Sequence, residues 1–218
     1  MKRLPPLCLA ALLAGCGSPQ QVAGTASQTG NAVAFGRIAL SGDTTKGDSG
    51  VVVHLRPLSW LPGDTAAAGA LQTDTTDAQG RFRFEGVPVD TYRVEAVGPS
   101  LGWSRTFRAT DATTTLPAAS LSSWGRLKIE IDPKDSMAGK AIGFFGLDRQ
   151  VVVPSSQHDT TILIDSLPVG LQSLIVYRSR SAISGGTSVR IGPDSTTKVD
   201  LDKLDSAFKH PEEDDDDH

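Results

Sequence analysis

Short runs of Val, Ile, Leu and Phe alternate with polar residues from about residue 32 to residue 204, and Gly, Pro, Asp, Ser and Thr separate the runs. Within residues 81–85, the two phenylalanines occupy alternate positions and charged side chains occupy the others. This two-residue period is typical of a strand with one buried face. No window after the N-terminal residues shows a 3.6-residue apolar repeat, so the pattern predicts an all-β chain with few helices.

The alternation predicts five strands in the first half of this region and a weaker one near Thr115. The five expected ranges are 34–40, 51–56, 81–85, 91–97 and 104–109. In residues 91–97 the apolar residues Tyr92, Val94 and Ala96 share one face and Arg93 and Glu95 share the other. We therefore expect Arg93 and Glu95 to lie outside the core of their unit.

Three segments recur in the two halves of the region, which indicates an internal duplication. The matched pairs are 84–90 with 164–170, 36–40 with 125–129, and 107–116 with 189–199. Each half holds roughly 85 residues, enough for a small sandwich with its own core. The sequence therefore predicts two β-sandwich units, residues 34–121 and residues 122–205.

The first residues follow a different pattern. Met1-Lys2-Arg3 is a basic start, residues 4–15 are uncharged and rich in Leu and Ala, and Gly17-Ser18-Pro19 ends the apolar run. A helix that crosses the hydrocarbon core needs about 20 apolar residues, and fewer are present here. This layout is typical of a secretory signal rather than a membrane span.

Leu13-Ala14-Gly15-Cys16 resembles the lipobox of bacterial lipoproteins. The resemblance implies that residues 1–15 are removed as a signal peptide and that acylated Cys16 anchors the chain in membrane lipid. An ordinary signal peptide with an incidental Cys16 is the alternative. In that family an Asp after the cysteine often signals inner-membrane retention. Gly17 stands here, so the resemblance favours the outer membrane of the bacterial cell envelope.

The two ends of the mature chain have the composition of unstructured segments. Residues 16–33 contain the lipidated cysteine and almost no large apolar side chain, which predicts a flexible tether. Residues 206–218 contain the run Asp214–Asp217, and like-charge repulsion predicts a disordered acidic tail. Cys8 would leave with the signal peptide, so the mature chain could form no internal disulfide.

The charge of the mature chain argues against a nucleic-acid partner. Removal of Lys2 and Arg3 with the signal peptide reduces the 21 basic residues to 19 against 25 acidic ones, a net charge of −6. Binding to phosphate backbones needs a clustered basic surface, and the composition offers none.

A known family has a similar core motif. Residues 76–84 share the T-D-x-x-G-x-F-x-F pattern of carboxypeptidase regulatory-like domains, and the similarity continues through Val87-Pro88 and Tyr92. The resemblance implies a prealbumin-like Greek-key β-sandwich of the carbohydrate-binding-like group. The second unit lacks the D-x-x-G turn and has Gln172 where the first has Tyr92. We therefore expect tandem prealbumin-like sandwiches, the second being a diverged copy.

Two short motifs resemble catalytic sites but lack the residues that catalysis needs around them. Gly47-Asp48-Ser49-Gly50 is similar to the nucleophile segment of chymotrypsin-like proteases, yet no histidine precedes it. His210 and Glu213 fit the H-x-x-E zinc pair of metallocarboxypeptidases, but they lie in the predicted tail, and a catalytic zinc needs about three ligands in a rigid site. We therefore expect no enzyme activity, cofactor or metal, and a metal-dependent hydrolase ranks third among the hypotheses.

Trp60 is the candidate ligand-binding residue. It lies in residues 56–63, a long irregular connection, and an exposed Trp ring can stack on a sugar. The alternative, which the sequence favours, is that Trp60 and Leu61 fold back and cap the core. The sequence thus predicts a non-catalytic structural or binding module of the cell envelope, with carbohydrate as the leading ligand class by fold-level analogy. The runner-up is an accessory protein that docks to a larger envelope assembly through exposed sheet edges.

Overall fold

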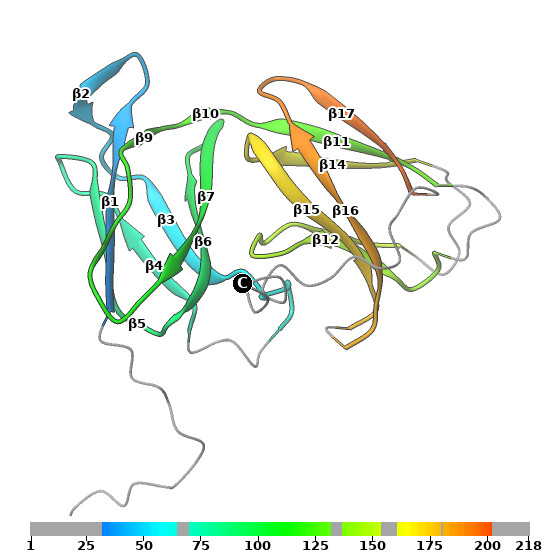
Figure 1. The fold of residues 1–218 in the computed structure, drawn as a ribbon. Helices are drawn as coiled ribbons and strands as arrows, with labels where there is room; N and C mark the ends of the chain where they lie inside the picture. Colours follow the sequence, from blue (N-terminus) through cyan, green and yellow to red (C-terminus); the bar gives the residue numbers. More distant parts are fainter. Residues whose placement is uncertain (1–31, 65–69, 132–136, 154–160, 180, 202–218) are drawn as a thin grey trace, which may run out of the picture.

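The computed structural model describes residues 32–64, 70–131, 137–153, 161–179 and 181–201. In these ranges the chain is built almost entirely of strands, which form two β-sandwiches (Figure 1). The expected all-β, tandem-sandwich fold is therefore confirmed. The expected signal peptide (1–15), Cys16, nearly all of the tether and the acidic tail (206–218) lie outside the described residues.

The first sandwich contains β1 to β10. One sheet has the order β2-β1-β5, with β8 and β9 pairing in parallel with β1. The facing sheet has the order β10-β7-β6-β3-β4. The strands are β1 (Ala32–Leu40), β2 (Asp43–Gly47), β3 (Val52–Pro57), β4 (Gln72–Thr75), β5 (Arg81–Val87), β6 (Asp90–Val97), β7 (Leu101–Ala109), β8 (Thr114–Thr115), β9 (Ala119–Ser120) and β10 (Ser122–Ser123).

The core of the first sandwich lies between these two sheets. On β5, Phe82 and Phe84 are buried and Arg81, Arg83 and Glu85 are exposed, as the alternation of the sequence predicts. The neighbouring strands contribute their apolar positions in the same way. The least exposed members of this core include Ile38, Val53, Leu55, Val87, Tyr92, Val94 and Ala96.

The second sandwich contains β11 to β17. Its sheets have the orders β14-β11-β17 and β13-β12-β15-β16. The strands are β11 (Gly125–Glu130), β12 (Ala141–Phe144), β13 (Gln150–Val152), β14 (Thr161–Leu167), β15 (Gly170–Tyr177), β16 (Ile183–Ile191) and β17 (Thr196–Asp200). A separate core fills it, and its least exposed members are Leu127, Ile129, Ile142, Phe144, Leu147, Leu167 and Leu174.

The two sandwiches repeat one strand order, as an internal duplication requires. The order β5-β1-β8 in the first corresponds to β14-β11-β17 in the second, with the last strand parallel to the middle one in both. The order β4-β3-β6-β7 corresponds to β13-β12-β15-β16. β5 and β14 even share the same sequence of buried and exposed positions.

The strand registers agree with two of the three sequence matches. Residues 84–90 and 164–170 occupy equivalent positions, since each segment ends β5 or β14 and begins the following strand. Phe107 pairs with Tyr92, and Val189 pairs with Gln172, so residues 107–116 and 189–199 are also equivalent.

The remaining match, between residues 36–40 and 125–129, is out of register by four residues. Gly36 pairs with Phe82 in the middle of β1, whereas Gly125 begins β11. The true counterpart of Gly36 is Ile129, because Ile129 pairs with Ile162, the equivalent of Phe82. A Cβ on Gly36 would lie 2.5 Å from a ring carbon of Phe82, so the phenylalanine requires glycine opposite it. The smaller Ile162 leaves room for a branched side chain.

The limits of the first sandwich differ slightly from residues 34 and 121. β1 already begins at Ala32, and Ser122–Ser123 pair with β7 as β10. The alternation did not predict β2 and β4, which are short and polar, or β12 and β13. Among the described residues, no helix is long and apolar enough to cross a membrane.

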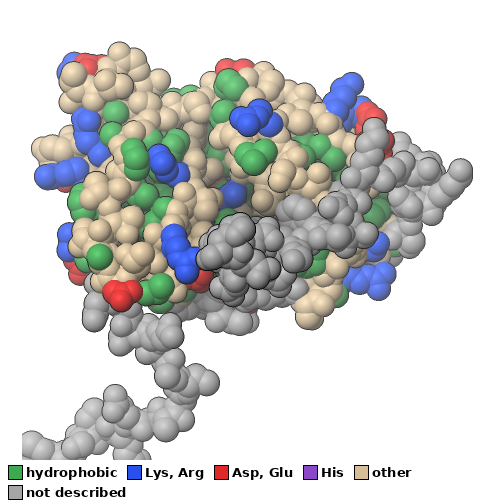
Figure 2. Space-filling model, in the orientation of Figure 1, with side chains coloured by type: hydrophobic (Ala, Val, Ile, Leu, Met, Phe, Trp, Pro, Cys, Tyr) green, Lys and Arg blue, Asp and Glu red, His purple; other side chains and the backbone are tan. Residues whose placement is uncertain are grey.

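Figure 2 shows basic, acidic and apolar side chains interspersed over the visible face of the first sandwich. This face therefore offers no continuous basic surface of the kind that phosphate backbones require.

We expect residues 32–124 to fold when they are expressed alone, because their core cluster is separate from that of the second sandwich. The fragment should unfold cooperatively in urea, with a lower midpoint than the full chain because its contact surface with the second sandwich is uncovered. Tryptophan fluorescence against urea concentration measures this. A fragment without a cooperative transition would show that the two sandwiches form one folding unit.

Candidate functional site

The two sandwiches meet in a buried junction. Its apolar part combines Leu58 and Leu61, from the segment after β3, with Phe145, Ile175 and Tyr177 of the second sandwich. These side chains form a cluster distinct from both cores. In Figure 1 the end of β3 lies between the two sandwiches. The irregular segment after β3 therefore packs between the two sandwiches.

Trp60 is part of this junction and is 6% exposed. Its carbonyl accepts a hydrogen bond of 2.9 Å from the backbone N–H of Gly146, which follows β12. The guanidinium of Arg56 lies 5.3 Å from the centre of its ring. The burial of Trp60 favours the interpretation that it is a cap over the interpretation that it contacts a sugar. Trp60 covers the contact between the two sandwiches, however, and not only the core of the first one.

A buried carboxylate lies next to Trp60. Glu95, on β6, is 0% exposed. Its Oε2 accepts a hydrogen bond of 2.7 Å from Nη1 of Arg56, on the adjacent strand β3. Its Oε1 lies 3.5 Å from Nη2 of Arg149, which precedes β13 in the second sandwich. Glu95 is thus ion-paired with both sandwiches at once.

Arg93 forms a second polar connection across the junction. Its Nη1 donates a hydrogen bond to Oε1 of Gln172 on β15, and Nε2 of Gln172 donates to the carbonyl of Pro168 at 2.9 Å. Burial lowers the pKa of Arg93 to about 10, against the opposing effect of the Glu95 carboxylate. Gln172 occupies the position of Tyr92 in the duplicated fold. The replacement of an aromatic side chain by an amide supplies an acceptor for a buried cation.

The junction also contains buried polar atoms that lack hydrogen-bond partners within the described ranges. Among the described residues, Nε1 of Trp60, Nε of Arg93 and Oε1 of Glu95 are buried without a hydrogen-bond partner. At 3.5 Å, Arg149 is an ion-pair partner of Oε1 but too distant for a strong hydrogen bond. Each unpaired buried group costs about 1–3 kcal/mol, which the surrounding packing must offset.

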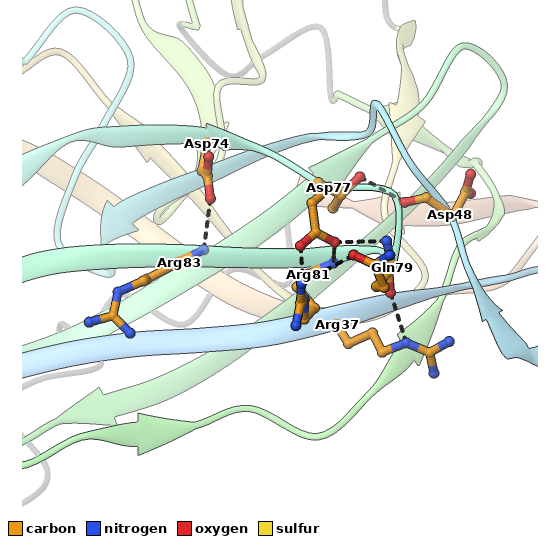
Figure 3. A network of polar contacts seen from close by, with 8 residues as sticks. Arg37, Asp48, Asp74, Asp77, Gln79, Arg81 and Arg83 are labelled. Atoms are coloured by element: carbon orange, nitrogen blue, oxygen red, sulfur yellow. Dashed lines mark hydrogen bonds and ion pairs between the residues drawn. The ribbon is translucent and has the colours of Figure 1, made fainter.

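A different set of polar contacts closes the edge of β5 (Figure 3). Oδ1 of Asp77 accepts a hydrogen bond of 2.9 Å from the backbone N–H of Arg81, and Oδ2 of Asp74 accepts one of 2.7 Å from that of Arg83. These N–H groups would otherwise face outward from an unpaired strand. The carboxylates of β4 and its turn therefore take the place of a neighbouring strand.

The turn between β4 and β5 explains the D-x-x-G part of the motif. Oδ1 of Asp77 also accepts a hydrogen bond of 2.8 Å from the backbone N–H of Gln79. The hydrogen bond from the backbone N–H of Arg81 lowers the pKa of Asp77. Gly80 has φ +74 and lies against the carbonyl of Ile38, where a Cβ would be 2.1 Å away. Nε of Arg37 donates to the carbonyl of Gln79 at 3.0 Å. The turn is thereby fixed on β1.

A pocket of about 420 Å³ lies beside this closed edge. Its lining combines the partly buried Phe35 with two acidic and two basic side chains, Asp74, Asp77, Arg81 and Arg83. The side chains of Arg81 and Arg83, two residues apart, project from the same face of β5. The sequence alone did not predict this site, because Val33 and Phe35 both lie at outward-facing positions of β1 and Phe35 does not stand out among them.

A second pocket, of about 460 Å³, opens between β16 and β17. Oγ1 of Thr197 donates a hydrogen bond of 2.9 Å to the carbonyl of Arg190 and joins the two strands there. The equivalent side of the first sandwich is closed, since β10 pairs with β7 and Leu121 enters the core. Within the described ranges, β16 pairs only with β15.

Of the other candidate motifs, the structure describes only the protease-like segment. Ser49 is exposed in the turn before β3. His54 lies on the outer face of β3, where Nδ1 is 3.1 Å from Oγ1 of Thr73 and burial lowers the pKa of the imidazole. His210 and Glu213 lie outside the described residues. In the part of the chain that the structure describes, no three His, Cys, Asp or Glu side chains are grouped as metal ligands.

No protein family matches the sequence, and no curated protein matches it either. The resemblance to carboxypeptidase regulatory-like domains therefore stays a hypothesis. Among solved structures, the minor pilin GBS52 of Streptococcus agalactiae is similar at 16% identity and a TM-score of 0.34, over 78% of this chain and 93% of the pilin.

Two proteins proposed to bind carbohydrate are also similar. One, from Pseudomonas aeruginosa, has 17% identity and a TM-score of 0.30 over 43% of this chain and 90% of its own. The other, from Bacteroides uniformis, has 12% identity and a TM-score of 0.30 over 73% of this chain and 99% of its own. Similarities at these low TM-scores assign no function to the chain.

Replacing Glu95 with Gln should destabilise the protein by about 3–5 kcal/mol, because Arg56 and Arg149 would lose the carboxylate that neutralises them. The free energy of unfolding in urea measures the loss. Asp165→Asn is the matched control, since Asp165 pairs with Arg126 on the surface and should change stability by at most about 1 kcal/mol. Equal effects of the two substitutions would contradict the role of Glu95.

Trp60→Ala should cost about 3–5 kcal/mol, as truncation of a buried aromatic side chain does. Leu171→Ala, at a side chain that is 60% exposed, provides a control that should cost far less. Urea unfolding compares the two. If Trp60→Ala unfolds like the native protein but no longer retains glycan, Trp60 is a ligand contact and the cap interpretation is wrong.

Proposed function

We propose that this chain is a lipid-anchored, non-catalytic module of the bacterial cell envelope that presents a rigid pair of β-sandwiches for binding or structural support. The observation that carries the proposal is the buried junction. Glu95 is paired with Arg56 of its own sandwich and Arg149 of the other, so the two bodies are held in one arrangement. A fixed frame of this kind suits display rather than a moving catalytic cleft.

The described part of the protease-like motif supports the non-catalytic part of the proposal. Ser49 is exposed before β3, and His54, the histidine within the described ranges, contacts the hydroxyl of Thr73. Carbohydrate is the ligand class that we favour for the module. The burial of Trp60 in the junction argues against a ligand site on its ring.

One observation favours docking to an envelope assembly as a second function. β16 is nine residues long, and among the described strands only β15 pairs with it. An unpaired strand edge offers backbone donors and acceptors to a strand of another protein. The same edge in the first sandwich is covered at β10.

Anchoring rests on the resemblance of Leu13-Ala14-Gly15-Cys16 to the lipobox. Cys16→Ser should therefore move the protein from the membrane fraction to the soluble envelope fraction, because the thioether to lipid cannot form. Cell fractionation and labelling with a fatty acid measure both effects. Cys8→Ser is the matched control, since Cys8 lies within the expected signal peptide and should leave anchoring unchanged. Labelled fatty acid on the Cys16→Ser protein would show that the lipid is attached elsewhere.

A further inference from the structure

The pocket beside β5 contains hydrogen-bond donors that have no partner among the described residues. Nε of Arg83 donates to Oε1 of Glu85 at 2.7 Å, and its two terminal nitrogens have no partner among the described residues. Nε and Nη2 of Arg81 donate to Asp77 and Gln79, which leaves Nη1 without a partner in the same part of the chain. The pocket therefore presents unused N–H groups from two guanidinium groups.

The acceptors of the pocket are already engaged. Both oxygens of Asp77 accept hydrogen bonds from Arg81, and Oδ1 accepts a further one from Gln79. The two oxygens of Asp74 accept from the backbone N–H groups of Thr75 and Arg83. Each of these carboxylate oxygens already holds at least one hydrogen bond, whereas terminal guanidinium nitrogens of Arg81 and Arg83 hold none within the described ranges, so a ligand with acceptors complements the pocket.

Phe35 adds an apolar surface next to these donors. It pairs with Arg83 across the β1–β5 ladder, and both side chains project from the outer face of the sheet. Phe35 is only partly buried, so part of its ring is open to the pocket. A ligand can thus contact an aromatic ring and a guanidinium group at the same time.

We propose that this pocket binds a saccharide ring that bears a carboxylate. The C–H face of the sugar packs on Phe35, and the carboxylate accepts paired hydrogen bonds from Arg83, with Arg81 beside it. The volume of about 420 Å³ is in the range of small-molecule sites. This inference rests on the proposed function, because it assigns a site and a ligand class to the binding module.

The chemistry of the pocket disfavours other charged ligands. A metal cation would meet Arg81 and Arg83, and the carboxylates that could ligate it are held by hydrogen bonds. A long polyphosphate would lie across Asp74, Asp77 and a chain of net acidic charge. A single carboxylate on a neutral ring instead needs only the two terminal nitrogens of Arg83, which have no partner among the described residues.

The frame around the pocket is rigid enough to hold this geometry. Arg37 donates to the carbonyls of Thr44 and Thr45 as well as to that of Gln79, so it ties β2 and the β4–β5 turn to β1. Asp74 and Asp77 fix β5 against β4. The donors of Arg81 and Arg83 are therefore supported by a fixed backbone, which lowers the entropy lost on binding.

Calorimetric titration of the full chain carrying Cys16→Ser tests the proposal. The probes are oligogalacturonate and oligomannuronate, each compared with the same oligosaccharide after reduction of its carboxyl groups. Binding should occur with the acidic probes and weaken about tenfold or more when the carboxyl groups are reduced, the effect of losing one charge-assisted hydrogen bond. Equal binding of the reduced probes would overturn the carboxylate as the recognised group.

Three variants locate the site. Arg83→Ala and Phe35→Ala should each weaken binding about tenfold or more, whereas Arg190→Ala, an exposed arginine of the second sandwich, should not change it. Arg83→Gln, which keeps a long side chain, serves if Arg83→Ala fails to fold, and urea unfolding verifies each variant.

The outcomes separate this inference from the proposed function. Unchanged binding by the folded Arg83 and Phe35 variants would place the site elsewhere while leaving a binding module intact. No binding of either acidic probe would overturn the ligand class. Neither result bears on membrane anchoring, which the fractionation of Cys16→Ser tests by itself.

Discussion

The arrangement of this protein depends on one buried carboxylate. Glu95 is fully enclosed, and its charge is tolerated because Arg56 lies in its own sandwich and Arg149 reaches it from the other. A buried ion pair gains little stability over an apolar contact of the same volume, but separating it leaves charges that water cannot reach. The pairing therefore specifies which relative position of the two sandwiches is allowed. The apolar contacts of Leu58 and Leu61 with the second sandwich then supply much of the attraction.

The duplicated sandwiches differ most where they touch. Tyr92 fills the first core, while its counterpart Gln172 accepts a hydrogen bond from Arg93 of the other copy. Gly146 packs closely on Arg93, and a Cβ at Gly146 would lie 3.0 Å from the Cβ of Arg93. At the position of Gln172, the second copy therefore has a polar side chain in place of an aromatic one, and that side chain contacts the first copy.

Sequence alternation predicted β5 and β6 well, because apolar and polar residues alternate along most of both strands. It placed Arg93 and Glu95 outside the core of their own sandwich, which is correct, but no sequence pattern shows that another sandwich covers that face. Trp60 was expected to be a cap for the same local reason, and the partner it covers could not be foreseen. The pocket at Phe35 was not predicted, because Val33 and Phe35 both face outward on β1 and the alternation does not distinguish that face from the core face. Pairing across distant strands, rather than local pattern, creates both sites.

The junction and the pocket use opposite sheets of the first sandwich. The outer face of β3 and β6 carries Arg56 and Glu95, and the second sandwich covers this face. The pocket forms instead at the β1–β5 sheet and its edge with β4, so a ligand there does not compete with the junction. β1 is paired with β5 on one side and with β2, β8 and β9 along the rest, which makes it the best supported strand of that sheet. Phe35 lies three residues into this strand from Ala32. It pairs with Arg83 on one side and with Thr115 on the other, so the ladders on both sides of β1 fix the backbone that carries the aromatic wall of the pocket.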